Sequence, residues 1–225
     1  NKSLKAKAIF GLFPANRVGD DIEVYENEKR DKVKGTFLTL RQQLQKREGE
    51  PNFSIADFIA PRESKIDDYI GCFCVSTGFG SDELSKEYED KIDDYNSIMV
   101  KALADRFAEA YAEYLHKEVR TNKWGYAKNE KLDNKELIKE SYKGIRPAPG
   151  YPACPDHLEK ETIWKLLDVE KAIGVKLTES LAMWPASSVS GYYFSNEKSK
   201  YFGLGNINED QLIDYAKRRK IDLEK

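Results

Sequence analysis

The sequence has few cysteines and few histidines. Its three cysteines, Cys72, Cys74 and Cys154, have neither the number nor the spacing of a disulfide framework or a structural zinc site. Its two histidines, His116 and His157, are too few for a histidine-rich metal centre. They also argue against a Ser-His-Asp catalytic triad formed wholly within the chain. We therefore expect reduced thiols and no metal site.

The sequence also lacks a strong net charge and a long apolar run. Its 37 basic and 39 acidic residues give a net charge of −2, which predicts neither a nucleic acid nor an anionic membrane as partner. No apolar run approaches the roughly 20 residues that a membrane helix needs, and the N-terminal segment has no signal-peptide core. We expect a cytoplasmic protein. Because Asn1 is not a methionine, we also expect a piece of a longer polypeptide.

The chain has enough apolar residues to form a substantial hydrophobic core, because 40% of its 225 residues are hydrophobic. In the first third, runs of apolar, β-branched or alternating residues bounded by turn residues predict strands. These expected strands are 8–13, 20–26, 33–40 and 68–80.

The middle of the chain has the period of a helix. Apolar residues recur every three or four positions from Glu83 to about Val119, which predicts one long helix that Ser81 and Asp82 can cap. Shorter helices are expected at 134–142, 160–172 and 209–219, and further strands at 176–185, 188–195 and 199–205. This order predicts an α+β fold, with the long helix beside a twisted antiparallel sheet.

The most unusual segment is GIRPAPGYPACPD (144–156), which holds four of the eight prolines. Proline removes a backbone donor and fixes φ, so the segment must be a stiff, extended loop. Such a loop would hold Arg146 and Tyr151 with little entropy left to lose on binding, and Arg146 could chelate a carboxylate. The alternative is a surface connection with a structural arginine.

Acidic residues recur on one face of the expected long helix. Asp105, Glu109 and Glu113 are four residues apart, so their like charges repel by about 0.2–0.5 kcal/mol per pair. One of them could address a cationic ligand, and Glu140 raises the same possibility. The alternative is a solvated face with ordinary ion pairs to nearby cations, namely Lys101, Arg106 and Lys117.

Two adjacent aromatic residues, Tyr201 and Phe202, lie in SKYFGLG (199–205). On a strand they would point to opposite faces, and packing in the core is the simplest interpretation. The chain has neither a dinucleotide-binding nor a phosphate-loop glycine motif.

Four blocks of sequence, in the same order, resemble the C-terminal activation domain of cobalamin-dependent methionine synthase. They are GLFPANRVGDDIEVY (11–25), DDYNSIMVKALADRFAEAYAEYLH (93–116), RPAPGYPACPDHLEK (146–160) and LTESLAMWPASSVSGYYFS (177–195). The similarity runs over almost the whole length. It implies one activation domain over residues 1–225, truncated at its N-terminal side, with the bent, C-shaped α+β fold of that family.

The resemblance also implies a function. The family's domain binds S-adenosylmethionine and docks over cobalamin, which the neighbouring domain of the same polypeptide carries outside this chain. When the cofactor is oxidised to cob(II)alamin, an electron from a flavodoxin or diflavin reductase and a methyl group from S-adenosylmethionine restore methylcobalamin. The whole enzyme is a methyltransferase with zinc only in its homocysteine domain, and the fragment is not expected to be catalytic alone.

Site residues follow from the same resemblance. Arg146 would bind the carboxylate of S-adenosylmethionine, while the backbone at Ala148 and the ring of Tyr151 would form the wall that faces the cobalamin domain. The remaining implied ligand residues are two acidic positions, Glu109 and Glu140, and two that contact the adenosyl part, Tyr201 and Phe202.

Asp105 matches a position at the interface with the cobalamin-binding domain, where it would receive the histidine released from cobalt. The family's domain also extends upstream of Asn1 and supplies an aspartate to the ligand site from there. Two other functions stay open: a docking module without ligand binding, and a free-standing S-adenosylmethionine-binding protein that serves another corrinoid enzyme.

Overall fold

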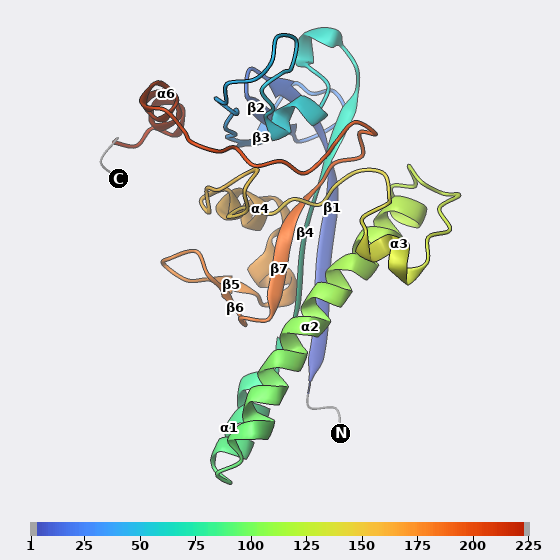
Figure 1. The fold of residues 1–225 in the computed structure, drawn as a ribbon, viewed down its shortest axis with the longest axis vertical. Coiled ribbons are helices and arrows are strands. Elements are labelled where there is room, and N and C mark those ends of the chain that lie inside the picture. Colours follow the sequence, from blue (N-terminus) through green and yellow to red (C-terminus); the bar gives the residue numbers. More distant parts are fainter. Residues whose placement is uncertain (1–3, 223–225) are drawn as a thin grey trace. The chain divides into compact units, whose positions relative to one another are not determined.

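The computed structural model describes residues 4–222 and has an α+β fold, as the sequence predicted (Figure 1). Its main antiparallel sheet has the strand order β3-β2-β1-β4-β7. These strands are β1 (Lys5–Val18), β2 (Asp21–Tyr25), β3 (Val33–Phe37), β4 (Asp68–Phe79) and β7 (Ser188–Tyr193). A second, two-stranded sheet pairs β5 (Lys176–Leu177) with β6 (Met183–Trp184).

Six α-helices are found in the described residues. They are α1 (Ser81–Glu89), α2 (Asp94–Glu118), α3 (Asn134–Ile138), α4 (Glu159–Leu167), α5 (Val169–Ile173) and α6 (Glu209–Arg219). Short 3₁₀ turns cover Ile55–Phe58 and Arg62–Ser64, and a π-helical turn, Val119–Lys123, follows α2.

The chain forms two compact units. Unit 1 comprises Asn1–Gly11, Cys72–Lys131 and Ile163–Gly191, and unit 2 comprises Leu12–Gly71, Leu132–Thr162 and Tyr192–Lys225. Strands β1, β4 and β7 each contribute residues to both units.

In unit 2, β1 and β2 form a tight hairpin. Val18 pairs with Asp21, and Gly19 takes a positive φ of 61° in the turn, where a side chain would be strained. The alternation in DIEVY turns Ile22 and Val24 inward, and both are fully buried.

In unit 1, β4 supplies the centre of the core. Its run from Cys72 to Val75 is fully buried, because β4 lies between two other strands and both its faces are covered. The three cysteines of the chain are buried and form no disulfide.

The long helix predicted over 83–119 is two helices. The chain leaves α1 after Glu89 and restarts at Asp94, with Ile92 at a φ of 58° between them. Asp93 caps the new helix, because its side chain accepts a hydrogen bond from the Asn96 N–H at 3.1 Å. The predicted Ser81-Asp82 cap is also wrong: Gly80 is the N-cap of α1, and it makes no side-chain capping bond.

Small residues form the buried face of α2. Ala104, Ala108 and Ala112 are at most 2% exposed, so the helix backbone lies close to its neighbours. Many of the large apolar residues whose period revealed the helix are exposed, among them Tyr95, Met99, Leu103 and Phe107. The period therefore identified the helix, but it did not identify the packed face.

The remaining predicted elements are confirmed in part. Helix α6 has the predicted bounds, whereas 134–142 shortens to α3, and 160–172 divides into α4 and α5 at Asp168, whose φ is 51°. The strand expected at 176–185 is the short β5–β6 hairpin, and the one at 188–195 is β7. Residues 199–205 form no strand, which corrects that prediction.

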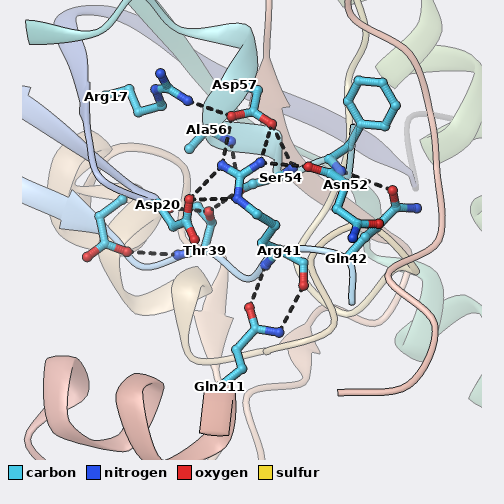
Figure 2. A network of polar contacts seen from close by, with 12 residues as sticks. Arg17, Asp20, Thr39, Arg41, Gln42, Asn52, Ser54, Ala56, Asp57 and Gln211 are labelled. Atoms are coloured by element: carbon cyan, nitrogen blue, oxygen red, sulfur yellow. Dashed lines mark hydrogen bonds and ion pairs between the residues drawn. The ribbon is translucent and has the colours of Figure 1, made fainter. Parts of the chain in front are cut away.

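An arginine network joins several segments of unit 2 (Figure 2). The Arg41 guanidinium binds both oxygens of Asp57, at 2.7 and 2.8 Å, and Asp20 at 2.6 Å. The backbone of Arg41 exchanges two hydrogen bonds with the side chain of Gln211 on α6, at 2.6 and 2.8 Å. Arg17 of β1 also binds Asp57 at 2.6 Å. The Arg41 guanidinium thus ties the β1–β2 hairpin to the 3₁₀ turn that contains Asp57, and the Arg41 backbone ties the same segment to α6.

We predict that Asp57→Asn lowers the free energy of unfolding by about 2 kcal/mol at pH 7, because it leaves two half-buried guanidinium groups, those of Arg17 and Arg41, without their charge partner. Burial acts to raise the pKa of Asp57, but the hydrogen bonds from Arg41 hold it below its ordinary value of 3.8. The stability that the carboxylate contributes is therefore present above that value and is lost as the pH falls through the lower, folded-state pKa.

Urea unfolding of wild type and variant at pH 7 and at pH 3 measures this difference, which should shrink at the lower pH. Asp67→Asn is the matched control, because Asp67 also binds an arginine but its side chain is 76% exposed. Equal losses in the two variants would contradict the prediction.

Candidate functional site

The proline-rich segment 144–156 is a loop of unit 2, as predicted, and its first half is fixed to the end of β7. Ile145 and Phe194 exchange two backbone hydrogen bonds, at 3.1 and 3.0 Å. The Tyr192 N–H donates to the Pro147 carbonyl at 2.9 Å. Arg146 lies between these anchors, so its backbone is held on both sides.

The second half of the loop folds back on itself. The Gly150 N–H donates to the Cys154 carbonyl at 2.8 Å, and the Tyr151 N–H donates to the Ala148 carbonyl at 3.2 Å. The Cys154 thiol donates to the same Ala148 carbonyl at 2.9 Å. Burial raises the pKa of Cys154 to about 12, so the thiol keeps the proton that this bond requires. Within this frame Ala148 is half-buried and Tyr151 is exposed.

Three of the predicted ligand residues come together beside the loop. The Arg146 backbone N–H donates to the Tyr201 hydroxyl oxygen at 3.0 Å. Burial raises the pKa of Tyr201. The hydrogen bond from the Arg146 backbone N–H lowers that pKa, and the Glu140 carboxylate raises it further. Glu140 therefore lies near enough to act on the same hydroxyl, and its φ of 53° marks the turn that leaves α3. The Arg146 guanidinium and the Glu140 carboxylate thus both act electrostatically on the Tyr201 phenol.

Phe202 packs in an aromatic cluster, which is the simpler of the two interpretations drawn from the sequence. Its ring centroid lies 5.9 Å from that of Phe53 and 6.2 Å from that of Phe58. Two residues further on, the Leu204 N–H donates to the Pro152 carbonyl at 2.9 Å. Segment 199–205, although not a strand, is thus fixed to the proline-rich loop.

Helix α6 holds the far end of the loop. The Tyr215 hydroxyl donates to Asp156 at 2.5 Å, and Arg219 binds Asp156 at 3.1 Å and pairs with Glu159. Burial raises the pKa of Glu159 to about 7, against the lowering effect of the Arg219 guanidinium. The loop is therefore anchored at both ends by contacts within unit 2.

A second group of predicted residues lies in unit 1. Asp105 and Glu109 line a pocket of about 440 Å³ together with Arg106 and Ser187. The Ser187 hydroxyl donates to Asp105 Oδ1 at 2.6 Å. This pocket has two carboxylates on its wall, both on exposed positions of α2.

The three acidic residues on the expected face of α2 differ in the contacts that the structure describes for them. Glu113 lies 3.8 Å from the fully buried guanidinium of Arg120, which also binds Glu130 at 2.8 Å. Lys101 pairs with Glu89 of α1 at 3.1 Å, so it does not serve the acidic face as the alternative interpretation supposed. Ordinary ion pairing therefore accounts for Glu113 but not for Asp105 or Glu109.

Two contacts, one in each unit, have no counterpart in the sequence analysis. Ser187 and Cys154 each donate to a predicted site residue, 82 and 6 positions away in the chain. The crowding of prolines around Cys154 was a signal that the loop needs internal support. Nothing in the sequence around Ser187 indicates a partner on α2.

In unit 2, the charges of Arg146 and Glu140 are complementary to those of a small molecule that carries a carboxylate and a cationic group. Within the described residues, no group of three or more His, Cys, Asp or Glu side chains is placed to hold a metal ion. No helix of the described part of the chain is both long and apolar enough to span a bilayer.

Comparison with known proteins assigns the family. The family model described as the activation domain of vitamin B12-dependent methionine synthase matches residues 1–220. A solved crystal structure of the MetH reactivation domain bound to AdoHcy is 57% identical in sequence, with a TM-score of 0.97. The match covers 99% of this chain and 68% of that one.

The chain therefore belongs to the family of activation domains of vitamin B12-dependent methionine synthase, a methyltransferase. The family resemblance and the α+β fold inferred from the sequence are both confirmed.

We predict that Gly150→Ala destabilises the loop. At Gly150 φ is 98°, and an added Cβ would lie 2.2 Å from His157 Cε1, so the side chain would meet both backbone strain and a clash. Gly49→Ala is the matched control, because its φ is 85° but nothing lies within 4 Å of the added Cβ. We expect a loss of about 1 kcal/mol in the control and a loss larger by up to about 1 kcal/mol at Gly150, because the exposed His157 ring must leave its place beside the loop.

Urea unfolding of the two variants measures the difference. Equal losses would show that the contact between Gly150 and His157 does not constrain the loop.

Proposed function

We propose that this chain binds S-adenosylmethionine and supports the reductive methylation of cob(II)alamin back to methylcobalamin. The observation that carries the proposal is the convergence of Arg146, Glu140 and Tyr201 beside a loop anchored at both ends. The similar structure, 57% identical, is described as bound to AdoHcy, which is what S-adenosylmethionine becomes when it gives up its methyl group.

Each group of the ligand has a matching side chain in unit 2. The Arg146 guanidinium binds the carboxylate with parallel hydrogen bonds, and the Glu140 carboxylate favours the ammonium and sulfonium charges. Tyr201 and Phe202 contact the adenosyl part, with Phe202 held by the two rings on which it packs. The Ala148 backbone and the exposed Tyr151 form the wall turned toward the cobalamin domain.

The task of these residues is to orient the ligand rather than to transfer protons. When cobalamin is present on its own domain, its cobalt, reduced by one electron, supplies the nucleophile that takes the methyl group from the sulfonium. The chain holds the donor by its carboxylate and amine and keeps water from it. We therefore propose that the chain is not catalytic alone.

Docking of the cobalamin-binding domain of the same polypeptide involves Asp105, which would accept the histidine released from cobalt, and Tyr151. A flavodoxin or diflavin reductase would supply the electron, in the cytoplasm, and zinc would belong only to the homocysteine domain of the full enzyme. The assignment of Glu109 to the ligand site stays a prediction, because Glu109 belongs to unit 1.

A second candidate function is a docking module that does not bind the ligand. It is favoured by one observation: Asp105 and its pocket in unit 1 are complete without any residue of the proline-rich loop. Both candidates predict docking, but only the first predicts that Arg146 matters for a small molecule.

We predict that Arg146→Ala weakens binding of S-adenosylmethionine by at least about 30-fold, because the ligand carboxylate loses its charged partner. Isothermal titration calorimetry measures the affinity, both for this chain and for a version extended upstream to include the family's additional aspartate. Arg62→Ala is the control, since Arg62 is also in unit 2 but pairs with Glu23.

An affinity that Arg146→Ala leaves unchanged, or the absence of binding by both lengths of the chain, would favour the docking module. Binding by the longer version alone would make the upstream aspartate essential.

A further inference from the structure

Ser187 lies at the edge of the pocket of unit 1, just before β7. It is 7% exposed, and its hydroxyl donates to Asp105 Oδ1 at 2.6 Å, the short length typical of a bond to a carboxylate. The contact joins α2 to the segment that leads into β7, although 82 residues separate the two in the chain.

Strand β4 fixes both ends of this contact. The Thr77 N–H donates to the Ser187 carbonyl at 3.0 Å, and the Thr77 hydroxyl donates to the carbonyl of Ala104, the neighbour of Asp105, at 2.6 Å. The Ser76 hydroxyl also donates to the Ser187 carbonyl, at 3.3 Å. Adjacent β4 residues thus hold the backbone of Ser187, which carries the donor, and the backbone beside Asp105, which carries the acceptor. The Ser187 hydroxyl therefore contacts the Asp105 carboxylate in one fixed geometry.

The hydrogen bond from Ser187 occupies one oxygen of the Asp105 carboxylate and leaves the other open to a further donor. Asp105 is exposed, and in the described part of the chain its Oδ2 makes no hydrogen bond and no ion pair. Arg106 lines the same pocket and, among the described residues, forms no ion pair with Asp105. A carboxylate with one oxygen fixed and the other open is an oriented acceptor for an N–H donor.

We propose that Ser187 is a positioning residue, which orients Asp105 to accept an imidazole N–H from the docking cobalamin domain. This inference rests on the docking role proposed for Asp105 and names the residue that acts through it. A carboxylate that must rotate into place loses rotamer freedom on binding, whereas one already held by Ser187 does not. A purely structural tether between α2 and β7 would have no such effect on docking.

The test uses the full polypeptide that carries this chain and its cobalamin-binding domain, loaded with cob(II)alamin. The visible spectrum reports whether the axial histidine is bound to cobalt, and so gives the equilibrium between undocked and docked forms. The variants are Ser187→Ala and Ser187→Cys, each alone and combined with Asp105→Ala; the cysteine nearly preserves the volume of serine if alanine impairs folding. Ser188→Ala is the control, because its hydroxyl donates to the Pro185 carbonyl in the same segment.

We expect Ser187→Ala and Ser187→Cys to reduce the docking equilibrium constant by about five- to tenfold. Combined with Asp105→Ala, either change should add less than about twofold, because the two residues act as one unit. Ser188→Ala should change the constant by less than about twofold.

The proposal is overturned if Asp105→Ala impairs docking while the Ser187 variants do not. It is equally overturned if the Ser187 variants impair docking to the same extent with and without Asp105, as a structural tether would. If Asp105→Ala docks as well as wild type, the docking role of Asp105 fails, and the role of Ser187 fails with it. Affinity for S-adenosylmethionine, read separately by calorimetry, should not change in the Ser187 variants.

Discussion

The structure of the candidate ligand-binding region depends on how a proline-rich segment satisfies the hydrogen-bonding groups of its backbone. Four prolines in thirteen residues remove the donors with which a loop could form regular structure, so the remaining groups must find partners elsewhere. They find them at the end of β7, in segment 199–205 and in the thiol of Cys154. The same contacts that compensate for the prolines hold Arg146 beside Tyr201. Rigidity and preorganisation therefore have one cause, and the entropy of ordering the loop is lost on folding instead of on binding.

Local chemistry explains which parts of the fold could be predicted from sequence. The strands of the first third follow from alternation and turn residues, and the bounds of α6 follow from its amphipathic period. The break before α2 was missed because the apolar period continues through Ile92. Asp93 caps α2, but the sequence contains many aspartates, and nothing local distinguishes this one as a cap. The exposed Met99, Leu103 and Phe107 show a second limit. Period identifies a helix, but alanines can form its packed face when neighbouring backbones approach closely.

The candidate site residues were predicted from the family resemblance, and composition alone left each of them with an alternative interpretation. Phe202 shows why, since an aromatic ring packed on Phe53 and Phe58 satisfies the simple interpretation and does not contradict the functional one. The hydrogen bond from Ser187 to Asp105 could not be predicted from the sequence, because it depends on how β4 positions two distant segments. Long-range register is a property of the folded sheet, and no local pattern in the sequence encodes it.

The acidic face of α2 shows that equal spacing does not mean equal function. Glu113 compensates the buried charge of Arg120, and its removal would leave Arg120 more dependent on Glu130. Asp105, two turns earlier, is instead held by a neutral hydroxyl that orients the carboxylate without neutralising it. A carboxylate paired with a cation has little attraction left for a partner, whereas one held by a hydroxyl keeps its full charge. The identity of the group beside each acid, set by tertiary structure, thus decides which acid stabilises the fold and which can meet another domain.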